Sequence, residues 1–401
     1  MNGQVVRDFL GPAIMKPVDA LRHELRYRPA AIWSRFNSAR ENRSKRALLL
    51  RSFDEIRENP PAVLIGPNIG GSNGITHHMS AIRQFSRLKV AISPPDWLMK
   101  ELSHHDLHTT FRDDVMNFEP KGTRVIHSHV FPYFIQWCRR HRESVSLWVH
   151  TYHSPFFPIG PDVPLEAWQT EYNRVLVEEA RYADVRISVS KWQQEYLLEQ
   201  HGIETLYVPN GVNVALCDLG SAERFRKRYG QDRFILYVGR NEPVKNPADF
   251  VRLAQRMPGE RFMMIGSGLT PEALSTDWDV ECPSNLLLAG SASHLEVQDA
   301  LAAAAVVVVT SLREGLPTLV LEAMAHRRNT VVPDEPGSVE AVAEGKFGTI
   351  YSPGDVDDLA AKVADALGKE RDFPMAREHV LETYDWRVVA PKLDAIYSGH
   401  R

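Results

Sequence analysis

Short runs of apolar residues recur from residue 62 to residue 352, and stretches with a helical pattern separate many of them. Most of these runs are rich in Val, Ile and Leu and hardly alternate with polar residues, which is typical of strands covered on both faces. Strands that alternate with helices in this way are typical of parallel α/β units. The pattern therefore predicts an α/β protein with doubly wound, parallel sheets.

The apolar runs divide into two sets of six. Strands are predicted in the first half at 62–66, 89–93, 124–129, 145–150, 185–190 and 205–209, and in the second half at 234–239, 261–266, 285–290, 306–311, 329–333 and 348–352. Helices are predicted at 75–87, 165–182, 191–201, 294–304, 317–327 and 356–367. Two domains joined near 209–213 follow, with ligands expected beyond the carboxyl ends of the strands.

Length and composition agree with two domains and exclude several classes of protein. A chain of 401 residues is too long for one ordinary core. A formal net charge of −4 offers no reason to expect a nucleic-acid partner. Cys138, Cys217 and Cys282 lack C-x-x-C spacing, which fits a reducing compartment. The longest apolar runs fall short of the roughly 20 residues that span a bilayer, and no signal-peptide pattern is present. We therefore expect a cytoplasmic protein.

Residues 1–60 differ from the rest because they hold twelve Lys or Arg against seven Asp or Glu. They are interpreted either as a solvated helical extension packed on the first domain or as a basic amphipathic element on anionic lipid. Prolines at 12, 17 and 29 favour the first interpretation because they interrupt any long amphipathic face.

Candidate chemistry begins in the loop "YVGRNEPVKNP" at 237–247, which follows a predicted strand. Arg240 and Lys245 lie there beside backbone N–H groups at the start of a helix, and two such cations suit a diphosphate. Loop cations also commonly face water, so this segment alone leaves both interpretations open.

The stretch "SLREGLPTLVLEAMAHR" at 311–327 carries two glutamates. Pro317 suits the first helical position, so Glu314 is expected in the exit loop of a strand and Glu322 in the second turn of the next helix. The unpaired backbone amides expected at this helix start are those of Gly315, Leu316, Thr318 and Leu319. Two acids flanking an anion-binding helix start suit a ligand with hydroxyls, one acid for a sugar ring and one for a ribose. The alternative is a capping glutamate and a solvated one.

These segments together resemble glycosyltransferase family 4, a retaining, nucleotide-sugar-dependent group with the GT-B fold of two Rossmann-like domains facing across a cleft. "REGLPTLVLEAMA" is similar to its E-x7-E signature, "GRNEPVKNP" to its G-R-x-x-x-x-K loop and "YVPNGVN" to its interdomain segment. The segment at 333–363 and the last helix, in "YDWRVVAPKLDAIY", also resemble the family. The resemblance covers roughly residues 62–398 and is strongest after 205.

The resemblance implies roles for individual residues. Arg240 and Lys245 would hold the donor diphosphate, Glu314 would contact the transferred sugar, and Glu322 would bind the ribose hydroxyls. Glu314, His153, Lys245 and Arg240 would form the catalytic set, because "TYHS" at 151–154 resembles the family's T-x-H element.

The same resemblance places Gly70 and Gly71, in "GPNIGGSNG", close to the donor phosphates. That loop lacks G-x-G-x-x-G spacing and the acid expected after the second strand, so a nicotinamide enzyme is disfavoured. His129, at the end of a strand, is a weaker candidate for the acceptor side. No role is assigned to the remaining histidines of the first half that lack a motif: His77, His78, His104, His105 and His108.

No cofactor or metal is expected. "DVDD" at 355–358 superficially matches a metal-binding D-x-D, but it opens a predicted helix, where acids complement the helix dipole. The expected partners are a nucleotide-sugar donor and a glycan, lipid-linked or small-molecule acceptor, with peripheral membrane contact through residues 1–60 as an option. The oligomeric state stays open.

The sequence thus predicts a basic extension at 1–60, an acceptor domain at 61–210, a nucleotide-sugar-binding domain at 211–375, and helices at 376–401 that cross back to the first domain. The expected activity is retaining transfer of a hexose-type sugar from a nucleoside-diphosphate sugar to a hydroxyl. Two alternatives remain: a nucleotide-sugar epimerase of the same fold, and a non-catalytic nucleotide-binding scaffold.

Overall fold

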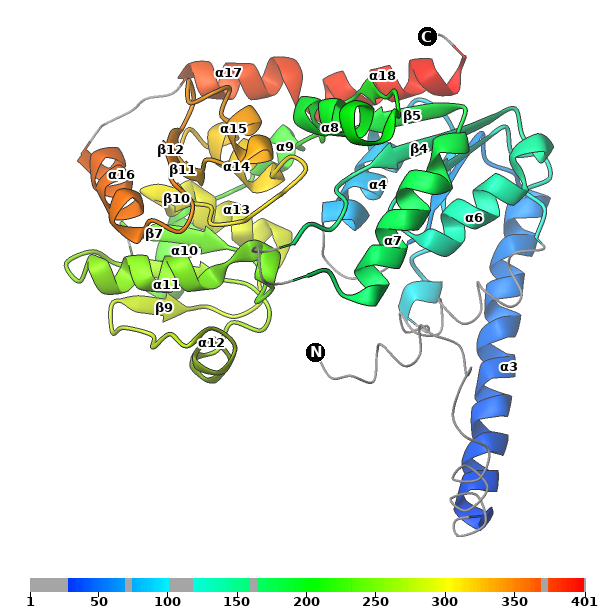
Figure 1. Ribbon diagram of the computed structural model, residues 1–401, viewed down its shortest axis with the longest axis horizontal. Coiled ribbons are helices and arrows are strands. Elements are labelled where there is room, and N and C mark those ends of the chain that lie inside the picture. Colours follow the sequence, from blue (N-terminus) through cyan, green and yellow to red (C-terminus); the bar gives the residue numbers. More distant parts are fainter. Residues whose placement is uncertain are drawn as a thin grey trace. The chain divides into compact units, whose positions relative to one another are not determined.

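The computed structural model describes residues 28–68, 74–100, 118–158, 164–231, 233–368 and 374–399. Two parallel six-stranded sheets form its framework, with strand orders β2-β1-β3-β4-β5-β6 and β12-β11-β10-β7-β8-β9 (Figure 1). All twelve predicted strands are present. Their bounds are β1 Val63–Gly66, β2 Val90–Ile92, β3 Val125–Ser128, β4 Leu147–Tyr152, β5 Val185–Ser188, β6 Leu206–Tyr207, β7 Ile235–Val238, β8 Phe262–Ile265, β9 Leu286–Leu288, β10 Val306–Val308, β11 Asn329–Pro333 and β12 Thr349–Tyr351.

Helices connect the strands, as parallel pairing requires. They are α3 Arg28–Glu58, α4 Gly74–Phe85, α6 Pro132–Arg140, α7 Ala167–Glu178, α8 Lys191–His201, α9 Val214–Cys217, α10 Ala222–Tyr229, α11 Pro247–Arg256, α12 Pro271–Trp278, α13 His294–Ala303, α14 Thr318–Ala325, α15 Pro336–Ala341, α16 Val356–Gly368, α17 Pro374–Thr383 and α18 Trp386–Tyr397. The six predicted helices are confirmed with small shifts at their ends. The predicted helix at 165–182 is α7 followed by the short 3-10 turn Ala180–Tyr182.

The apolar strands are buried because both faces of each sheet are covered. Every residue of β1, β3, β8, β10 and β11 is buried. In the second sheet, Phe262 on β8 meets Phe250 on α11 with ring centroids 5.5 Å apart, and Phe250 meets Tyr237 on β7 at 5.3 Å. This layer of aromatic rings holds α11 on the sheet and supports the loop that joins β7 to α11.

The chain forms two compact units. The first contains Met1–Gly70, Val90–His150 and Leu165–Asp184, and the second contains Gly71–Lys89, Thr151–Pro164 and Val185–Arg401. The second unit therefore holds the whole second sheet as well as α4, α8 and the segment after β4. All the candidate residues between 240 and 322 belong to this unit.

Helix α3 runs without interruption from Arg28 to Glu58 and is the long blue helix of Figure 1. Pro29 is its second residue, where a missing N–H costs nothing, so this proline does not break the helix as the sequence suggested. Within the first unit, Leu49 and Phe53 are buried, and Phe53 contacts Phe118 with centroids 4.1 Å apart. Pro12 and Pro17 lie outside the described residues.

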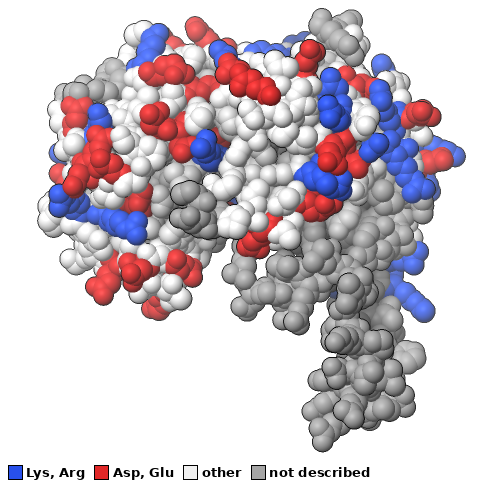
Figure 2. Space-filling view, in the orientation of Figure 1, with Lys and Arg blue, Asp and Glu red and all other residues white. Residues whose placement is uncertain are grey.

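The described helices include none that is both long and apolar enough to cross a membrane. Among the described residues on the face shown in Figure 2, acidic and basic side chains are interspersed.

The expected capping role of "DVDD" is confirmed. The side chain of Asp355 accepts a hydrogen bond from the Asp358 backbone N–H at 2.9 Å, and the Asp358 side chain accepts one from the Ser352 N–H at 2.8 Å. These acids close the start of α16.

Gly266, directly after β8, gives a test of the packing under the β7–α11 loop. A Cβ atom at this position would lie 1.7 Å from the carbonyl oxygen of Gly239, the residue that precedes Arg240. We expect Gly266→Ala to lower the free energy of unfolding by about 3 kcal/mol, since two backbone segments must separate. Denaturant unfolding measures the loss. Gly259→Ala is the matched control, because a Cβ there meets nothing within 4 Å; equal stability of the two variants would contradict the prediction.

Candidate active site

Lys245 and Glu314 meet because the strands that precede them are neighbours. β7 and β10 pair in parallel, so the loops after them leave the same edge of the sheet. Lys245 ends the 3-10 turn Pro243–Lys245 after β7, and Glu314 lies in the loop after β10. Their side chains form an ion pair, with 2.6 Å between Lys245 Nζ and Glu314 Oε1.

The two loops are also joined through their backbones. Thr310 Oγ1 donates to the carbonyl oxygen of Lys245 at 3.0 Å, and the Leu312 N–H donates to the Val244 carbonyl at 2.8 Å. Two hydrogen bonds between the loops therefore hold the backbone of Lys245 close to the segment that carries Glu314.

Glu314 is charged in the folded protein. Burial works to raise the pKa of Glu314, but Lys245, Ser311 and Arg240 outweigh it, and the pKa lies below its ordinary value. Arg240 is half-exposed and pairs with Glu242 at 2.9 Å. The two cations predicted from the 237–247 loop thus act on the first acid of the E-x7-E segment.

Helix α14 begins one residue later than expected. Pro317 has φ −72° and ψ 107°, so it is the N-cap in extended conformation, and Thr318 is the first helical residue. Glu322 remains in the second turn, as predicted. The difference arises because the chain must leave the loop in extended form before it can turn into the helix.

Gly315 lies in tight contact with another backbone segment. A Cβ atom there would be 2.0 Å from the carbonyl oxygen of His153, and the indole N–H of Trp192 donates to the Gly315 carbonyl at 2.6 Å. The segment after β4 is thereby set against the start of the E-x7-E segment. The side chain of His153 meets His78 edge-on, with ring centroids 4.9 Å apart.

Glu322 lies in a pocket of about 310 Å³ in the second unit. Its Oε1 accepts a hydrogen bond from Nε2 of His294, the first residue of α13, at 2.8 Å. His77 lies beside them, with its ring centroid 4.7 Å from that of His294. Asn213 and Trp386 also line the pocket. The two acids of the segment therefore have different partners, a lysine for Glu314 and a histidine for Glu322.

The remaining predicted residues divide into three groups. Thr318 and Leu319 line the pocket with Glu322. Leu316 is buried in the apolar core, although its carbonyl accepts from Asn210 Nδ2 at 3.1 Å. Gly70 and Gly71 lie outside the described residues.

His129 belongs to the first unit. It follows β3, is fully buried, and its backbone N–H donates to the carbonyl of Gly66 at 3.3 Å. Its ring centroid is 4.3 Å from that of His127. An acceptor role for His129 stays a prediction.

Sequence reasoning missed three histidines at the pocket. His77 and His78 were assigned no role, and His294 was seen only as the start of a helix. His78 is buried, and this burial lowers its pKa to about 4; its ring meets the indole of Trp386 at 5.0 Å. No local motif surrounds these residues, and only the fold brings them together.

Comparisons with known proteins agree with this geometry. Residues 221–380 match the model of the family "Glycosyl transferases group 1", and residues 86–216 match that of "Glycosyltransferase Family 4". Sucrose-phosphate synthase from Thermosynechococcus elongatus is similar in structure, with TM-score 0.69 and 19% identity over 84% of this chain and 98% of that one. Anabaena HepE in complex with UDP and glucose has TM-score 0.65 and 15% identity, over 84% and 98%.

Curated relatives are enzymes of the same kind. D-inositol 3-phosphate glycosyltransferase of Mycolicibacterium smegmatis is 27% identical over 70% of this chain and 68% of its own length. Phosphatidyl-myo-inositol mannosyltransferase of the same species is 25% identical over 53% of this chain, and the match spans only 56% of that enzyme.

Two Rossmann-like sheets and the matched glycosyltransferase segments define an enzyme of the GT-B class, a transferase that moves glycosyl groups. Within that class, the chain belongs to glycosyltransferase family 4, as its motifs suggested.

Removing the cation beside Glu314 gives a prediction about stability and pH. In Lys245→Met we expect the free energy of unfolding at pH 7 to fall by about 1–2 kcal/mol, because a mostly buried carboxylate loses its counter-ion. Since the pKa of Glu314 is lowered in the fold, the stabilisation is present above pH 4.5 and is lost as the pH falls through the folded value.

Thermal unfolding from pH 7 to pH 3 measures this difference. The gap in melting temperature between wild type and Lys245→Met should close at the acid end. Lys362→Met is the control, because its 3.9 Å pair with Asp358 is exposed and is expected to matter little. A gap that is independent of pH would contradict the pairing.

Proposed function

We propose that this glycosyltransferase transfers a hexose-type sugar, with retention of anomeric configuration, from a nucleoside-diphosphate sugar to an acceptor hydroxyl. The observation that carries the proposal is the 2.6 Å ion pair of Lys245 and Glu314 at the same strand edge from which α14 brings Glu322 into the pocket. Cations and acids placed in this way suit a ligand that is anionic in its middle and hydroxylated at both ends.

Each residue then has a distinct task. Arg240 and Lys245 bind the diphosphate and stabilise the charge that develops as it leaves, which is usually the dominant electrostatic contribution. Lys245 pairs with Glu314, so the donor would share the lysine with that acid. Glu314 orients the transferred sugar, and Glu322 accepts hydrogen bonds from the ribose.

We propose that sugar transfer needs no metal ion, because two cationic side chains act where a metal would otherwise neutralise the leaving diphosphate. The acceptor attacks on the face from which the diphosphate departs, and a phosphate oxygen takes the acceptor's proton. Glu314 supports this step by position and charge and is not assigned as a nucleophile. The side chain of His153 would contact the transferred sugar.

The acceptor class is proposed from the names of relatives and not from the site residues. The names of two curated relatives point to inositol carrying a phosphate or phosphatidyl group, so a phosphorylated cyclitol is the first acceptor to test. A glycan and a lipid-linked sugar come next. Should the acceptor be lipid-linked, the basic residues at 1–60 would supply contact with an anionic membrane.

A ligand panel tests the function as a whole. Thermal unfolding is measured with UDP, GDP and ADP and with their glucose or mannose conjugates, since a ligand that binds only the folded state raises the melting temperature. The stabilising donor is then incubated with each acceptor, with and without a chelator. Isomerised donor without transfer would identify an epimerase, and nucleotide binding without turnover would identify a scaffold.

The first catalytic prediction concerns Glu314 and Lys245. We expect Glu314→Ala and Lys245→Ala each to lower the rate of sugar transfer by about 100-fold or more, the loss typical of a principal electrostatic contact. Steady-state assays with the donor found above measure the rate. Glu281→Ala, which removes an exposed carboxylate, is the control and should keep wild-type activity. Near-normal turnover in either of the first two variants would refute the assignment.

The second prediction concerns Glu322. We expect Glu322→Ala to weaken binding of the donor nucleotide by about 1–3 kcal/mol, because a partly buried polar pair is lost. Calorimetric titration of the nucleoside diphosphate gives the dissociation constant of each protein. Unchanged affinity in a variant that still unfolds cooperatively would exclude Glu322 from the ribose site.

A further inference from the structure

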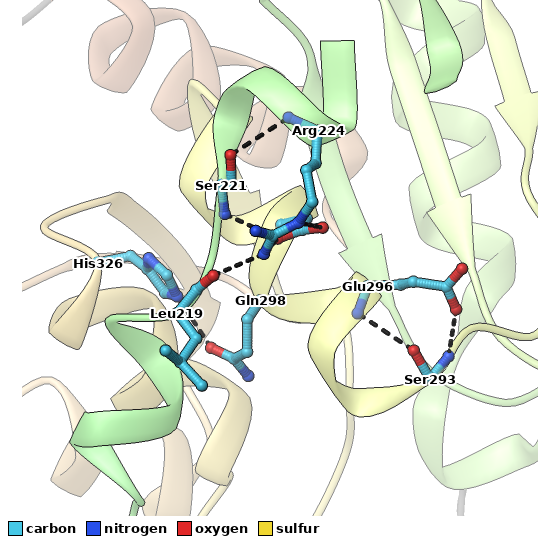
Figure 3. Close-up of polar contacts among 8 residues, drawn as sticks. Leu219, Ser221, Arg224, Ser293, Glu296, Gln298 and His326 are labelled. Atoms are coloured by element: carbon cyan, nitrogen blue, oxygen red, sulfur yellow. Dashed lines mark hydrogen bonds and ion pairs between the residues drawn. The ribbon is translucent and has the colours of Figure 1, made fainter. Parts of the chain in front are cut away.

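Helix α13 is anchored at the end that carries His294. The Ser293 side chain accepts from the Glu296 N–H, and the Glu296 side chain accepts from the Ser293 N–H at 2.7 Å, which together form a capping box. Figure 3 shows this box beside the contacts of Ser221 and Arg224 on the neighbouring helix α10. His294 is therefore the first residue of a helix whose start is fixed by the capping box.

The next turns of α13 are fixed as well. The guanidinium of Arg224 donates to both oxygens of Asp299, at 3.0 and 2.7 Å, and the Ser221 N–H donates to the same carboxylate at 2.7 Å. Arg228 pairs with Glu296. Arg224 and Arg228 of α10 thus bind Asp299 and Glu296 of α13. The packing of these two helices sets the position of His294 at the start of α13.

Two polar pairs join α13 to α14 one helical turn apart. His294 donates to Glu322, and His326 Nε2 donates to Gln298 Oε1 at 2.8 Å (Figure 3 shows the second pair). Both helices advance by four residues between the pairs, as residues on one helix face do. We call these the His294–Glu322 pair and the Gln298–His326 pair.

The two pairs differ in charge. Burial lowers the pKa of His326 to about 4, so the Gln298–His326 pair is neutral near pH 7. The hydrogen bond to Glu322 instead raises the pKa of His294, against the opposing effect of burial. His77 on α4 faces His294, and its own pKa is lowered by burial and by the charge of His294. Of these three histidines, His294 is the one whose protonated form the fold favours, because it lies beside Glu322.

We propose that His294 is a positioning residue for donor binding: it holds one oxygen of Glu322 and leaves the other to accept a ribose hydroxyl. Among the described residues Glu322 Oε2 has no hydrogen-bond partner, and Glu322 lines the pocket. This inference rests on the proposed function, in which Glu322 binds the ribose. Without the His294 contact, the carboxylate would be free to turn away from the ligand.

Variants at His294 test the proposal through nucleotide affinity. UDP, GDP and ADP are titrated calorimetrically, and the tightest binder is used. We expect His294→Leu to weaken binding about 10-fold, as for the loss of one hydrogen bond to a charged group, and His294→Gln to stay within about 3-fold because its amide still donates. Gln298→Leu breaks only the Gln298–His326 pair and serves as the control for helix packing.

The pH dependence of nucleotide affinity distinguishes a positioning role of His294 from a purely structural one. Wild-type affinity should fall as the pH rises through the raised pKa of His294, because the positive charge beside Glu322 is lost. In His294→Gln this part of the pH dependence should disappear. Equal losses in His294→Leu and Gln298→Leu, or the same pH profile in wild type and His294→Gln, would overturn the proposal.

A ligand-free measurement keeps the inference distinct from the proposed function. The stabilisation from a raised histidine pKa is complete below about pH 6.5 and is lost as the pH rises through the folded value. The melting temperature of wild type should therefore exceed that of His294→Gln more at pH 6 than at pH 9. Absence of this difference would refute the pair itself. If this difference is present but UDP, GDP and ADP all fail to bind in the titrations, the proposed function and the ligand role of His294 are rejected, and the His294–Glu322 pair stands.

Discussion

The ion pair between Lys245 and Glu314 is the contact on which the rest of the site depends. It forms across two loops that leave neighbouring parallel strands, so it requires β10 and β7 to lie side by side in the sheet. A mostly buried carboxylate needs its cation, and the cation in turn fixes the loop after β7. The start of α14, and with it the position of Glu322, follows from where Glu314 is held.

The seven residues between Glu314 and Glu322 place the two acids in different surroundings. Glu314 stays in the loop, beside Lys245 and Arg240, whose positive charges suit an anion. Glu322 is carried by the second turn of α14 into a pocket that histidines and an indole line. A loop followed by a helix holds the two carboxylates apart on firmly packed elements, one beside Lys245 and one in the pocket.

Much of the fold could be predicted because buried parallel strands have a plain sequence pattern. Val306–Val308 and Phe262–Ile265 are entirely apolar, since both of their faces are covered. The start of α14 was predicted one residue early, because the proline ring fixes φ but not ψ, and Pro317 has an extended ψ of 107°. Family resemblance assigned Lys245 and Glu314 to one donor site, but their ion pair was not predicted and follows from the order of the strands in the sheet.

The amino-acid sequence by itself determined the two sheets, the helix that carries Glu322 and the family to which the chain belongs, because these rest on local periodicity and on contiguous motifs. Only the tertiary structure decided that His294 holds Glu322, that His77 lies beside it and that Gly315 packs against His153. Such contacts join segments that are far apart in the chain. The residues next to a position in the sequence do not determine which distant side chain the packing of helices will bring into contact with it.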